Sequence, residues 1–402
     1  MQSSAPKHQP RAGLRKLPGS IWALGLVSLF MDISSEMIHG LLPVFLTSVL
    51  GAGSQIVGLI EGVGEATASI AKLFSGWLSD RLGNRKVLTA IGYGLAALSK
   101  PLFAVAPSPS FVLAARFSDR IGKGIRDAPR DALISDLVAG GSRGAAYGLR
   151  QALDTIGAVV GPLLAILLMV VLNNDFRSVF WLAVIPGLIA VVIMIVGVRE
   201  PPRRSTANKE PIRFDEIKHI GRAYWIVVGV GAILTLARFS EAFLILRAQN
   251  AGLTAALAPL VLVVMNIVYA LAAYPLGALS DRIDRGLMLA AGFAILIAAD
   301  LVLATASSVA LVMVGVGLWG LHMAMTQGLL SALIADAAPD RLRGTAFGVF
   351  NFASGMALLL ASLIAGFLWE IIGPSATFIA GACFTALGLC ALFLTRRVTL
   401  AS

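Results

Sequence analysis

The sequence predicts an all-α membrane protein whose twelve transmembrane helices form two pseudo-symmetric halves of six. Three observations support this fold class. The chain has 402 residues, of which 57% are hydrophobic and only 13% charged, a composition typical of integral membrane proteins. Apolar runs of about 20 residues, long enough to cross a bilayer, recur along the whole chain. Short motifs of the first half recur in the second, which indicates an internal duplication.

Twelve segments are expected to cross the membrane. They are residues 21–48, 56–79, 86–106, 110–137, 144–172, 178–198, 223–248, 255–280, 287–305, 309–336, 344–370 and 375–395. The first apolar run is too long for a cleaved signal peptide. The chain is therefore divided, in order, into an N-terminal tail, a six-helix half, a charged linker, a second six-helix half and a C-terminal tail. These are residues 1–20, 21–198, 199–222, 223–395 and 396–402.

The distribution of basic residues predicts the orientation of these helices. Lys and Arg gather in the N-terminal tail, in the linker and in every second loop, whereas the other loops carry almost only Arg177 and Arg247. By the positive-inside rule the basic side faces the cytoplasm. Both termini are therefore expected there, with the protein embedded in the lipid bilayer of the inner (plasma) membrane. This distribution also explains the net charge of +10, so no nucleic-acid partner is expected.

The segment 110–137 is the least apolar of the twelve, because nine charged residues lie between Arg116 and Asp136. The duplication nevertheless predicts that it spans. Residues 132–136 (ALISD) match residues 332–336 (ALIAD), and this second copy belongs to the apolar segment 309–336. The charged segment should therefore also cross the membrane, with its charges facing protein or water rather than lipid.

Charged side chains are distributed unevenly among the predicted spans. Spans one, two, four, five and seven carry most of them, and spans six and twelve carry none. Spans three and nine carry about one each, Lys100 and Asp300. Because a charge facing lipid is costly, spans three, six, nine and twelve are expected on the outside of the bundle, and the charged spans around an interior.

Asp32 and Glu36 are the candidate proton-coupling residues of span one. They are four residues apart and so share a helix face. Two carboxylates this close in a low-dielectric site do not both ionise readily, so one of them can carry a proton. The alternative is structural ion pairing with arginines of span four. Asp154 in span five is a second candidate proton carrier.

Span four supplies bases to the same predicted interior. These bases either form structural ion pairs or bind an anionic group and couple to span one, and the sequence leaves both interpretations open. They are Arg116, Arg120, Lys123 and Arg126. A stripe of Glu61, Glu65 and Lys72 on span two is interpreted as structural.

Three further candidates lie in the second half. Glu241 is interpreted as a local pair with Arg238 in span seven. His322 and Gln327 in span ten are candidates for proton transfer or substrate contact, because histidine titrates near physiological pH. The alternative for a lone histidine is a purely structural hydrogen bond.

Several motifs make the chain resemble transporters of the major facilitator superfamily along its whole length. The pattern Gly76-x-x-x-Asp80-Arg81-x-Gly83-x-Arg85-Lys86 resembles the family's signature between spans two and three, although Asp284 replaces the second glycine in the repeated copy. Arg116 resembles the family's span-four arginine, with Arg120 as an alternative register. The resemblance implies that spans one, four, seven and ten line a central cavity. It also implies a charge network at a cytoplasmic gate, formed by Asp80, Arg81, Arg85 and Asp136.

A further motif resembles the span-five signature of the antiporter branch of this family. Its residues are Gly148, Gly157, Gly161 and Pro162, with Ala165 in place of the last glycine. Small residues let two helices approach closely, so the motif also has a packing interpretation. The two interpretations are compatible, because a rocking transporter needs helices that pack closely and slide.

These features predict a secondary transporter that works by alternating access. The predicted activity is proton-coupled efflux of a small organic compound, so the partners are that substrate and protons, and a monomer is expected. The first alternative is proton-coupled uptake of an organic anion, such as a sugar acid or siderophore-like solute. The second is a non-transporting receptor. The sequence has no metal-ligand cluster, nucleophile–base set or phosphate-binding loop, so no metal, cofactor, ATP-driven pumping or enzymatic activity is expected.

Overall fold

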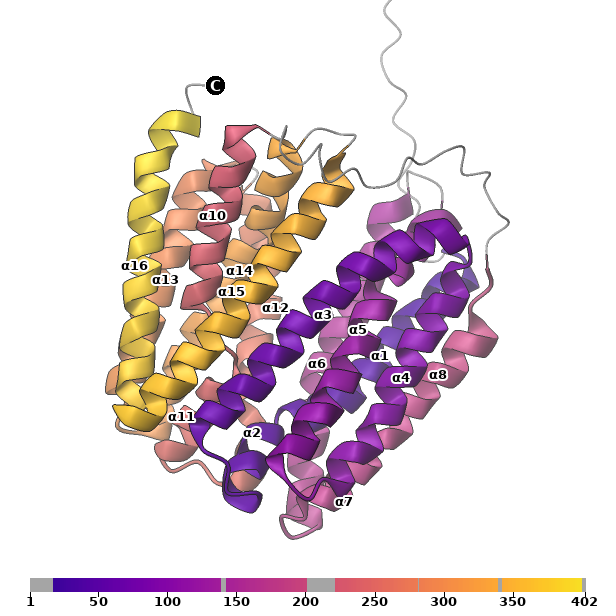
Figure 1. The fold of residues 1–402 in the computed structure, drawn as a ribbon, viewed down its shortest axis with the longest axis horizontal. Coiled ribbons are helices and arrows are strands. Elements are labelled where there is room, and N and C mark those ends of the chain that lie inside the picture. Colours follow the sequence, from indigo (N-terminus) through magenta and orange to yellow (C-terminus); the bar gives the residue numbers. More distant parts are fainter. Residues whose placement is uncertain (1–16, 139–141, 201–220, 281, 339–341, 400–402) are drawn as a thin grey trace, which may run out of the picture.

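The computed structural model describes residues 17–138, 142–200, 221–280, 282–338 and 342–399 (Figure 1). Over these ranges the chain is helical, with no β-strand, which confirms the all-α prediction. Most of the predicted N-terminal tail (1–20) and linker (199–222) lies outside the described residues, as does the side chain of Asp80.

The N-terminal half contains six spans, two of which are divided. Its elements are α1 (Gly19–His39), α2 (Leu42–Val44), the π-helix η2 (Phe45–Val49), α3 (Ser54–Leu82), α4 (Arg85–Val105), α5 (Pro109–Leu137), α6 (Arg143–Val171), α7 (Phe176–Leu182) and α8 (Val184–Gly197). The first span consists of α1, α2 and η2, and the sixth consists of α7 and α8.

The C-terminal half repeats this plan. Its elements are α10 (Arg222–Ala237), α11 (Ala242–Asn250), the 3-10 helix η4 (Ala255–Leu257), α12 (Leu260–Ser280), α13 (Arg285–Thr305), α14 (Val309–Ala337), α15 (Arg343–Ile371) and α16 (Pro374–Thr399). Residues 238–240 are not helical, so the seventh span is divided into α10 and α11. We call residues 238–240 the span-seven joint. The last helix continues to Thr399, into the predicted C-terminal tail.

All twelve predicted spans are helical, with boundaries within four residues of the prediction. In the described part of the chain, ten spans are long and apolar enough to cross a membrane. The other two, α3 and α5, are more charged, but each has 29 residues, which is about 43 Å of helix. Figure 1 shows both running alongside their neighbours in the N-terminal half. The prediction that the charged segment 110–137 belongs to the bundle is confirmed.

Close helix contacts bury α5 between α3 and α4. A methyl group on Gly122 would lie 2.7 Å from the backbone nitrogen of Ala96 on α4, and one on Gly124 would lie 2.7 Å from the Ala68 carbonyl oxygen on α3. Five charged side chains of α5 are consequently at most 7% exposed: Arg116, Asp119, Arg120, Arg126 and Arg130. As predicted, these charges face protein rather than lipid.

The twelve spans alternate in direction, so α1 begins and α16 finishes at one end of the bundle, at the top in Figure 1. We call this the termini end. At the opposite end, the guanidinium group of Arg177 donates to the carbonyl oxygens of Ala104 and Ala106, both at 2.8 Å, where α4 finishes. Arg247 does the same for α13, donating to the Leu303 oxygen at 2.7 Å. A cation there satisfies unpaired carbonyls and complements the helix dipole. Arg177 and Arg247, the two basic residues on the otherwise non-basic side of the bundle, therefore have a structural role.

The outer position of spans three, six, nine and twelve is confirmed. In Figure 1, α13 and α16 form one edge of the bundle, and α4 and α8 form the other. Lys100 of α4 and Asp300 of α13 nevertheless point away from lipid, because Lys100 is 2% exposed and Asp300 is fully buried. An outer helix therefore carries its charge on the face that packs against its neighbours.

Besides the packing of α3 against α15, where a methyl group on Gly348 would lie 2.5 Å from the Leu73 side chain, the two halves share an apolar core at the end opposite the termini. That cluster combines residues of both halves, such as Phe45 and Phe243. The clusters nearer the termini end each belong to a single half; one contains Tyr93 and another contains Tyr224. The bundle is therefore sealed between its halves at the opposite end.

Candidate transport site

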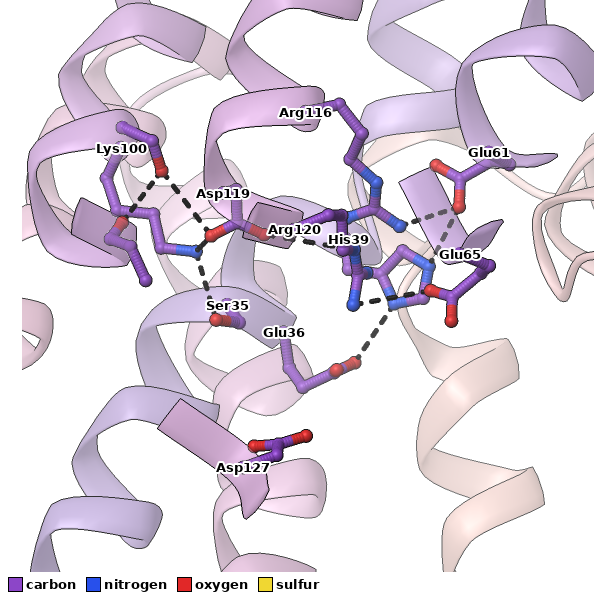
Figure 2. Close-up of polar contacts among 12 residues, drawn as sticks. Ser35, Glu36, His39, Glu61, Glu65, Lys100, Arg116, Asp119, Arg120 and Asp127 are labelled. Atoms are coloured by element: carbon purple, nitrogen blue, oxygen red, sulfur yellow. Dashed lines mark hydrogen bonds and ion pairs between the residues drawn. The ribbon is translucent and has the colours of Figure 1, made fainter. Parts of the chain in front are cut away.

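A network of charged side chains connects α1, α3 and α5 inside the N-terminal half (Figure 2). His39 lies between two carboxylates, 3.5 Å from Glu36 through Nδ1 and 3.5 Å from Glu61 through Nε2. The Arg116 guanidinium donates to Glu61 at 2.6 Å, and Arg120 lies 3.3 Å from Glu65. We call these residues the Glu61 network: Glu36, His39, Glu61, Glu65, Arg116 and Arg120.

Helical periodicity explains why the two residues that each helix contributes to this network lie on the same helix face. Each helix contributes two residues three or four positions apart, so both lie on one face. The helices α3 and α5 approach closely at Gly64, where a methyl group would lie 3.2 Å from the Arg116 side chain. This brings the acids of α3 within reach of the bases of α5. Glu61 and Arg116 are 1% and 3% exposed, and either charge alone would be strongly disfavoured there.

A second buried ion pair fixes α4 to α5 and α1. The Lys100 ammonium group donates to Asp119 at 2.7 Å and to the Ser35 hydroxyl at 3.0 Å. Figure 2 shows this pair beside the Glu61 network. The alternating acids and bases of α5 are thus used largely in ion pairs between helices.

Asp32 faces Asp154 of α6. The two carboxyl groups lie within hydrogen-bonding reach of each other, and Arg150 of α6 lies 3.6 Å from Asp154. Two ionised carboxylates repel, so a hydrogen bond between them requires a proton on one of them. Glu36 lies 3.5 Å from His39, and its charge also acts on Asp32, so the proton-coupling role of Asp32 and Glu36 stays a prediction.

The glycines of the antiporter-like motif hold α6 against α1 at this position. A methyl group on Gly157 would lie 2.7 Å from a backbone oxygen of α1, and one on Gly161 would lie 2.8 Å from another. Pro162 is buried, and α6 remains helical through it. Gly148 has open space around it. The packing interpretation is confirmed for Gly157 and Gly161 but is wrong for Gly148.

The remaining predicted bases of span four lie nearer the termini end. Arg126 packs over the Tyr93 ring, 4.6 Å from its centroid, and lies 3.8 Å from Asp127. Lys123 lies close enough to Glu36 to act on its charge but makes no ion pair with any residue that the structure describes. Arg116 and Arg120 are therefore paired with acids of α3, whereas Lys123 lies near acids without forming an ion pair in the described part of the chain.

The C-terminal half reaches this region through the span-seven joint. The Ser240 hydroxyl lies 3.4 Å from the Glu61 carboxylate. Glu241, which directly precedes α11, lies near enough to His39 to interact with its charge. Arg238 and Glu241 influence each other, but no direct ion pair joins them in the described part of the chain. The predicted local ion pair is thus absent from the described part of the chain, and the charge of Glu241 is influenced both by Arg238 and by His39 of the other half.

Of the two candidates of span ten, His322 makes contacts that the structure describes in detail. The His322 Nδ1 atom lies 2.8 Å from the Gly292 carbonyl oxygen of α13, and the ring is fully buried. His322 therefore joins α13 to α14, which matches the structural alternative. Gln327 is half-buried on α14.

The predicted gate residues lie at the termini end. Gly83 terminates α3 with a φ of 64°, a conformation that favours glycine. Arg85 lies 3.0 Å from Asp136, and the repeated residues Arg285 and Asp336 form the equivalent ion pair. Each pair lies within one half, so in this conformation neither bridges the halves.

The other residues of that motif pack locally. A methyl group on Gly76 would lie 3.5 Å from Ala128 of α5, an ordinary contact. The Arg81 guanidinium lies over the Trp77 ring, 5.5 Å from its centroid. The side chain of Asp80 is outside the described residues.

At the opposite end, a carboxylate of one half binds a helix of the other. Glu370 of α15 accepts a hydrogen bond from the Ser54 hydroxyl at 3.0 Å and from the backbone N–H of Gln55 at 3.4 Å. These residues begin α3, whose unpaired N–H groups and dipole favour a negative charge. Gly53 leaves the necessary room, because a methyl group there would lie 2.6 Å from the carboxylate. We call this contact the Glu370 latch.

Three contact residues were not predicted: His39, Ser240 and Glu370. His39 could have been found, because it lies three residues after Glu36 and seven after Asp32 on the same helix face. Ser240 and Glu370 carry no local signal. Their partners lie 179 and 316 residues away in the sequence.

Two six-helix halves around buried charges are the architecture of a secondary transporter. The chain matches the family model described as Major Facilitator Superfamily over residues 24–247 and 227–402, and it belongs to that family. It is 35% identical over 389 residues to the uncharacterized MFS-type transporter MJ1317 of Methanocaldococcus jannaschii, covering 94% of this chain and 96% of that protein. It is 26% identical over 195 residues to the quinolone resistance protein NorA of Staphylococcus aureus, covering 48% of each. Among solved structures, the nucleoside transporter NupG matches with a TM-score of 0.81 at 13% identity, covering 93% and 99% of the two chains.

Proposed function

We propose that this transporter exports a small organic compound in exchange for protons. The observation that carries the proposal is the pair of facing carboxyl groups, Asp32 on α1 and Asp154 on α6. Such a pair binds one proton readily, because two negative charges at this separation repel. A group that exchanges one proton inside the bundle is the minimum that proton coupling requires.

The charge balance of this pair favours exchange of a proton for a cationic or polar compound. With one proton shared between the carboxyl groups, Arg150 at 3.6 Å from Asp154 makes the group neutral overall. Loss of the proton leaves one net negative charge, which attracts a positively charged or strongly hydrogen-bonding substrate. Proton and substrate then compete for one site, and competition of this kind couples their movements in opposite directions.

Two observations support export. The close packing of Gly157 and Gly161 against α1 places the antiporter-like motif directly behind Asp32 and Glu36. The relative NorA is named as a quinolone resistance protein, and resistance to a drug is consistent with its removal from the cell.

Uptake of an organic anion is the alternative, and the contacts of α5 weigh against it. An anion site needs positive charge that is not already neutralised. Arg116 and Arg120 are paired with Glu61 and Glu65, which leaves Lys123 as the clearest candidate. The interior is therefore less basic than the sequence of span four suggests.

We further propose that the termini end faces the cytoplasm of a cell whose inner membrane holds the protein. Basic residues of the described chain, such as Arg85 and Lys86 at the start of α4, lie at that end, as the positive-inside rule requires. Since the halves share an apolar core at the opposite end, the protein would then be closed toward the other side of the membrane in this conformation.

Liposomes that contain the purified protein and an internal pH-sensitive dye test the proposal. Compounds such as ethidium, tetraphenylphosphonium and benzoate are added to one side, and proton movement is recorded. The proposal predicts compound-dependent proton movement opposite to the compound. Movement in the same direction would establish uptake instead, and no proton movement with any transported compound would contradict proton coupling.

A further inference from the structure

Asp300 is a buried acid in the C-terminal half that the Asp32–Asp154 pair does not use. It lies on α13 and is fully buried. Both of its carboxyl oxygens are buried without a hydrogen-bond partner among the described residues. An ionised carboxylate in such surroundings is strongly disfavoured, because it has lost its water and gained no donor.

The internal duplication shows what is missing beside Asp300. Its counterpart in the first half is Lys100, 200 residues earlier, which forms an ion pair with Asp119 at 2.7 Å. The counterpart of Asp119 is Trp319 on α14, whose indole nitrogen is likewise buried without a partner. An indole N–H donates one hydrogen bond but carries no charge. Among the described residues, the C-terminal half has thus kept the position of the pair without a cation, so a proton is needed to neutralise the acid there.

The surrounding helices supply no ion pair either. On α14, His322 binds the Gly292 carbonyl, and on α11, Arg247 binds carbonyl groups at the end of α13. Arg238 lies in the span-seven joint. None of these charges forms an ion pair or hydrogen bond with the Asp300 carboxyl, whose two oxygens are buried without a partner in the described part of the chain. The α16 residue that faces Asp300 is Gly381. A methyl group added to Gly381 would lie 2.8 Å from Asp300 Oδ2.

The span-seven joint connects this acid to the other half. The methyl group added to Gly381 would also lie 3.1 Å from the Phe239 ring. Phe239 and Asp300 therefore lie side by side next to Gly381. The ring also packs against Trp319, with centroids 5.4 Å apart. The next residue of the joint, Ser240, contacts Glu61 in the N-terminal half. Separation of the halves would therefore pull on the joint that covers Asp300.

We propose that Asp300 is a second proton-binding site, located in the C-terminal half, which Phe239 closes in this conformation and which movement of the span-seven joint opens. A role of this proton in the transport cycle rests on the proposed function. The binding of a proton by Asp300 in this conformation is independent of the proposed function.

Infrared spectroscopy of the full chain in lipid nanodiscs at neutral pH tests the proposal without a substrate. The proposal predicts that Asp300→Asn removes one carbonyl stretching band of a protonated carboxyl group. Asp175→Asn is the matched control: this exposed residue caps α7, and its hydrogen bonds from Ser178 lower its pKa, so the same substitution there should remove no such band. An unchanged spectrum for Asp300→Asn would contradict the proposal.

Two further measurements test the closure. In the wild type, the Asp300 band should shift slowly after transfer to heavy water, because its proton is sealed from solvent; an immediate shift would contradict closure. In Phe239→Ala, water reaches the carboxyl group, so the band should be lost at neutral pH, and a retained band would show that Phe239 is not the cover. The heavy-water measurement uses the unmodified protein and needs only the band assignment from Asp300→Asn, so it holds even if Phe239→Ala fails to fold. Neither depends on proton flux, so failure of antiport and failure of this proposal are distinguishable.

Discussion

At the scale of single residues, Glu61 is where the buried contacts of both halves meet. His39 of α1, Arg116 of α5 and Ser240 of the span-seven joint all approach its carboxylate. A buried carboxylate with three partners from three segments fixes the relative positions of those segments. Its charge is therefore a structural requirement as much as a functional one.

Glu61→Gln should destabilise the protein by about 3–5 kcal/mol, because it leaves the Arg116 guanidinium buried without a counter-charge. The free energy of unfolding in detergent measures this directly. Adding Arg116→Gln should recover most of the loss. Glu65→Gln is the control, since Glu65 is more exposed and should cost much less. Equal stability of Glu61→Gln and the wild type would show that the pair is not formed.

The sequence identifies the charged residues of the interior but not their partners. Asp32, Glu36 and Asp154 stand out because a charge in an apolar span is costly. The pairing of Asp32 with Asp154 depends on how α6 packs against α1, which helical spacing within α1 cannot reveal. Lys100 and Asp300 were recognised as charges of outer spans, but their inward direction depends on the rotation of each helix about its axis.

At the scale of elements, the contact between α1 and α6 determines whether the facing carboxyl groups stay together. Gly157 and Gly161 permit backbone contact there, and close contacts of this kind are the usual role of small residues in membrane helices. The contact lies within one half, so it should persist while the halves move relative to each other.

Gly157→Ala should push α6 away from α1 and destabilise the protein by about 1–3 kcal/mol, because the added methyl group meets backbone that cannot move aside. Gly148→Ala on the same helix has open space and should change stability by at most about 0.5 kcal/mol. Thermal unfolding of both variants in detergent makes the comparison. The contact is refuted if the two variants are equally stable.

The spans themselves were predictable, and their interruptions were not. Apolar length and the duplication located all twelve helices, including the charged α5. The break at 238–240 has no proline or glycine and interrupts an otherwise continuous pattern, so no local signal marks it. It is stabilised by contacts such as that of Ser240 with Glu61, which form only in the assembled bundle.

At the scale of the whole molecule, the two halves share a framework but differ in their interior. Arg177 and Arg247 bind the C-terminal carbonyl groups of two equivalent helices, α4 and α13. Arg85–Asp136 and Arg285–Asp336 are equivalent ion pairs. The Glu61 network has no counterpart among the described residues of the C-terminal half. The N-terminal half thus carries the charge, while the C-terminal half contributes mainly apolar and aromatic side chains.

The Glu370 latch should hold the end opposite the termini shut. Glu370→Gln weakens a charge–dipole contact between halves, so it should favour opening of that end. A matched control is Glu200→Gln, because Glu200 caps α4 in the same way, through the Arg85 and Lys86 N–H groups, but within one half. Only the first variant should shift the conformation.

Thiol labelling measures this opening. In a background lacking Cys383 and Cys390, the reporter Ala258→Cys lies fully buried at the opposite end. Its labelling rate should rise several-fold with Glu370→Gln and stay unchanged with Glu200→Gln. Equal rates in all three proteins would show that the latch does not hold the halves together.

The central claim is that Asp32 and Asp154 couple transport to protons, and one comparison tests it most directly. Proteoliposomes carrying Asp32→Asn or Asp154→Asn are loaded with a compound that the wild type transports. Uptake driven by a pH gradient and exchange of labelled for unlabelled compound at equal pH are then measured separately. The facing carboxyl groups predict loss of gradient-driven transport with exchange retained. Gradient-driven transport at the wild-type rate in both variants would contradict the claim.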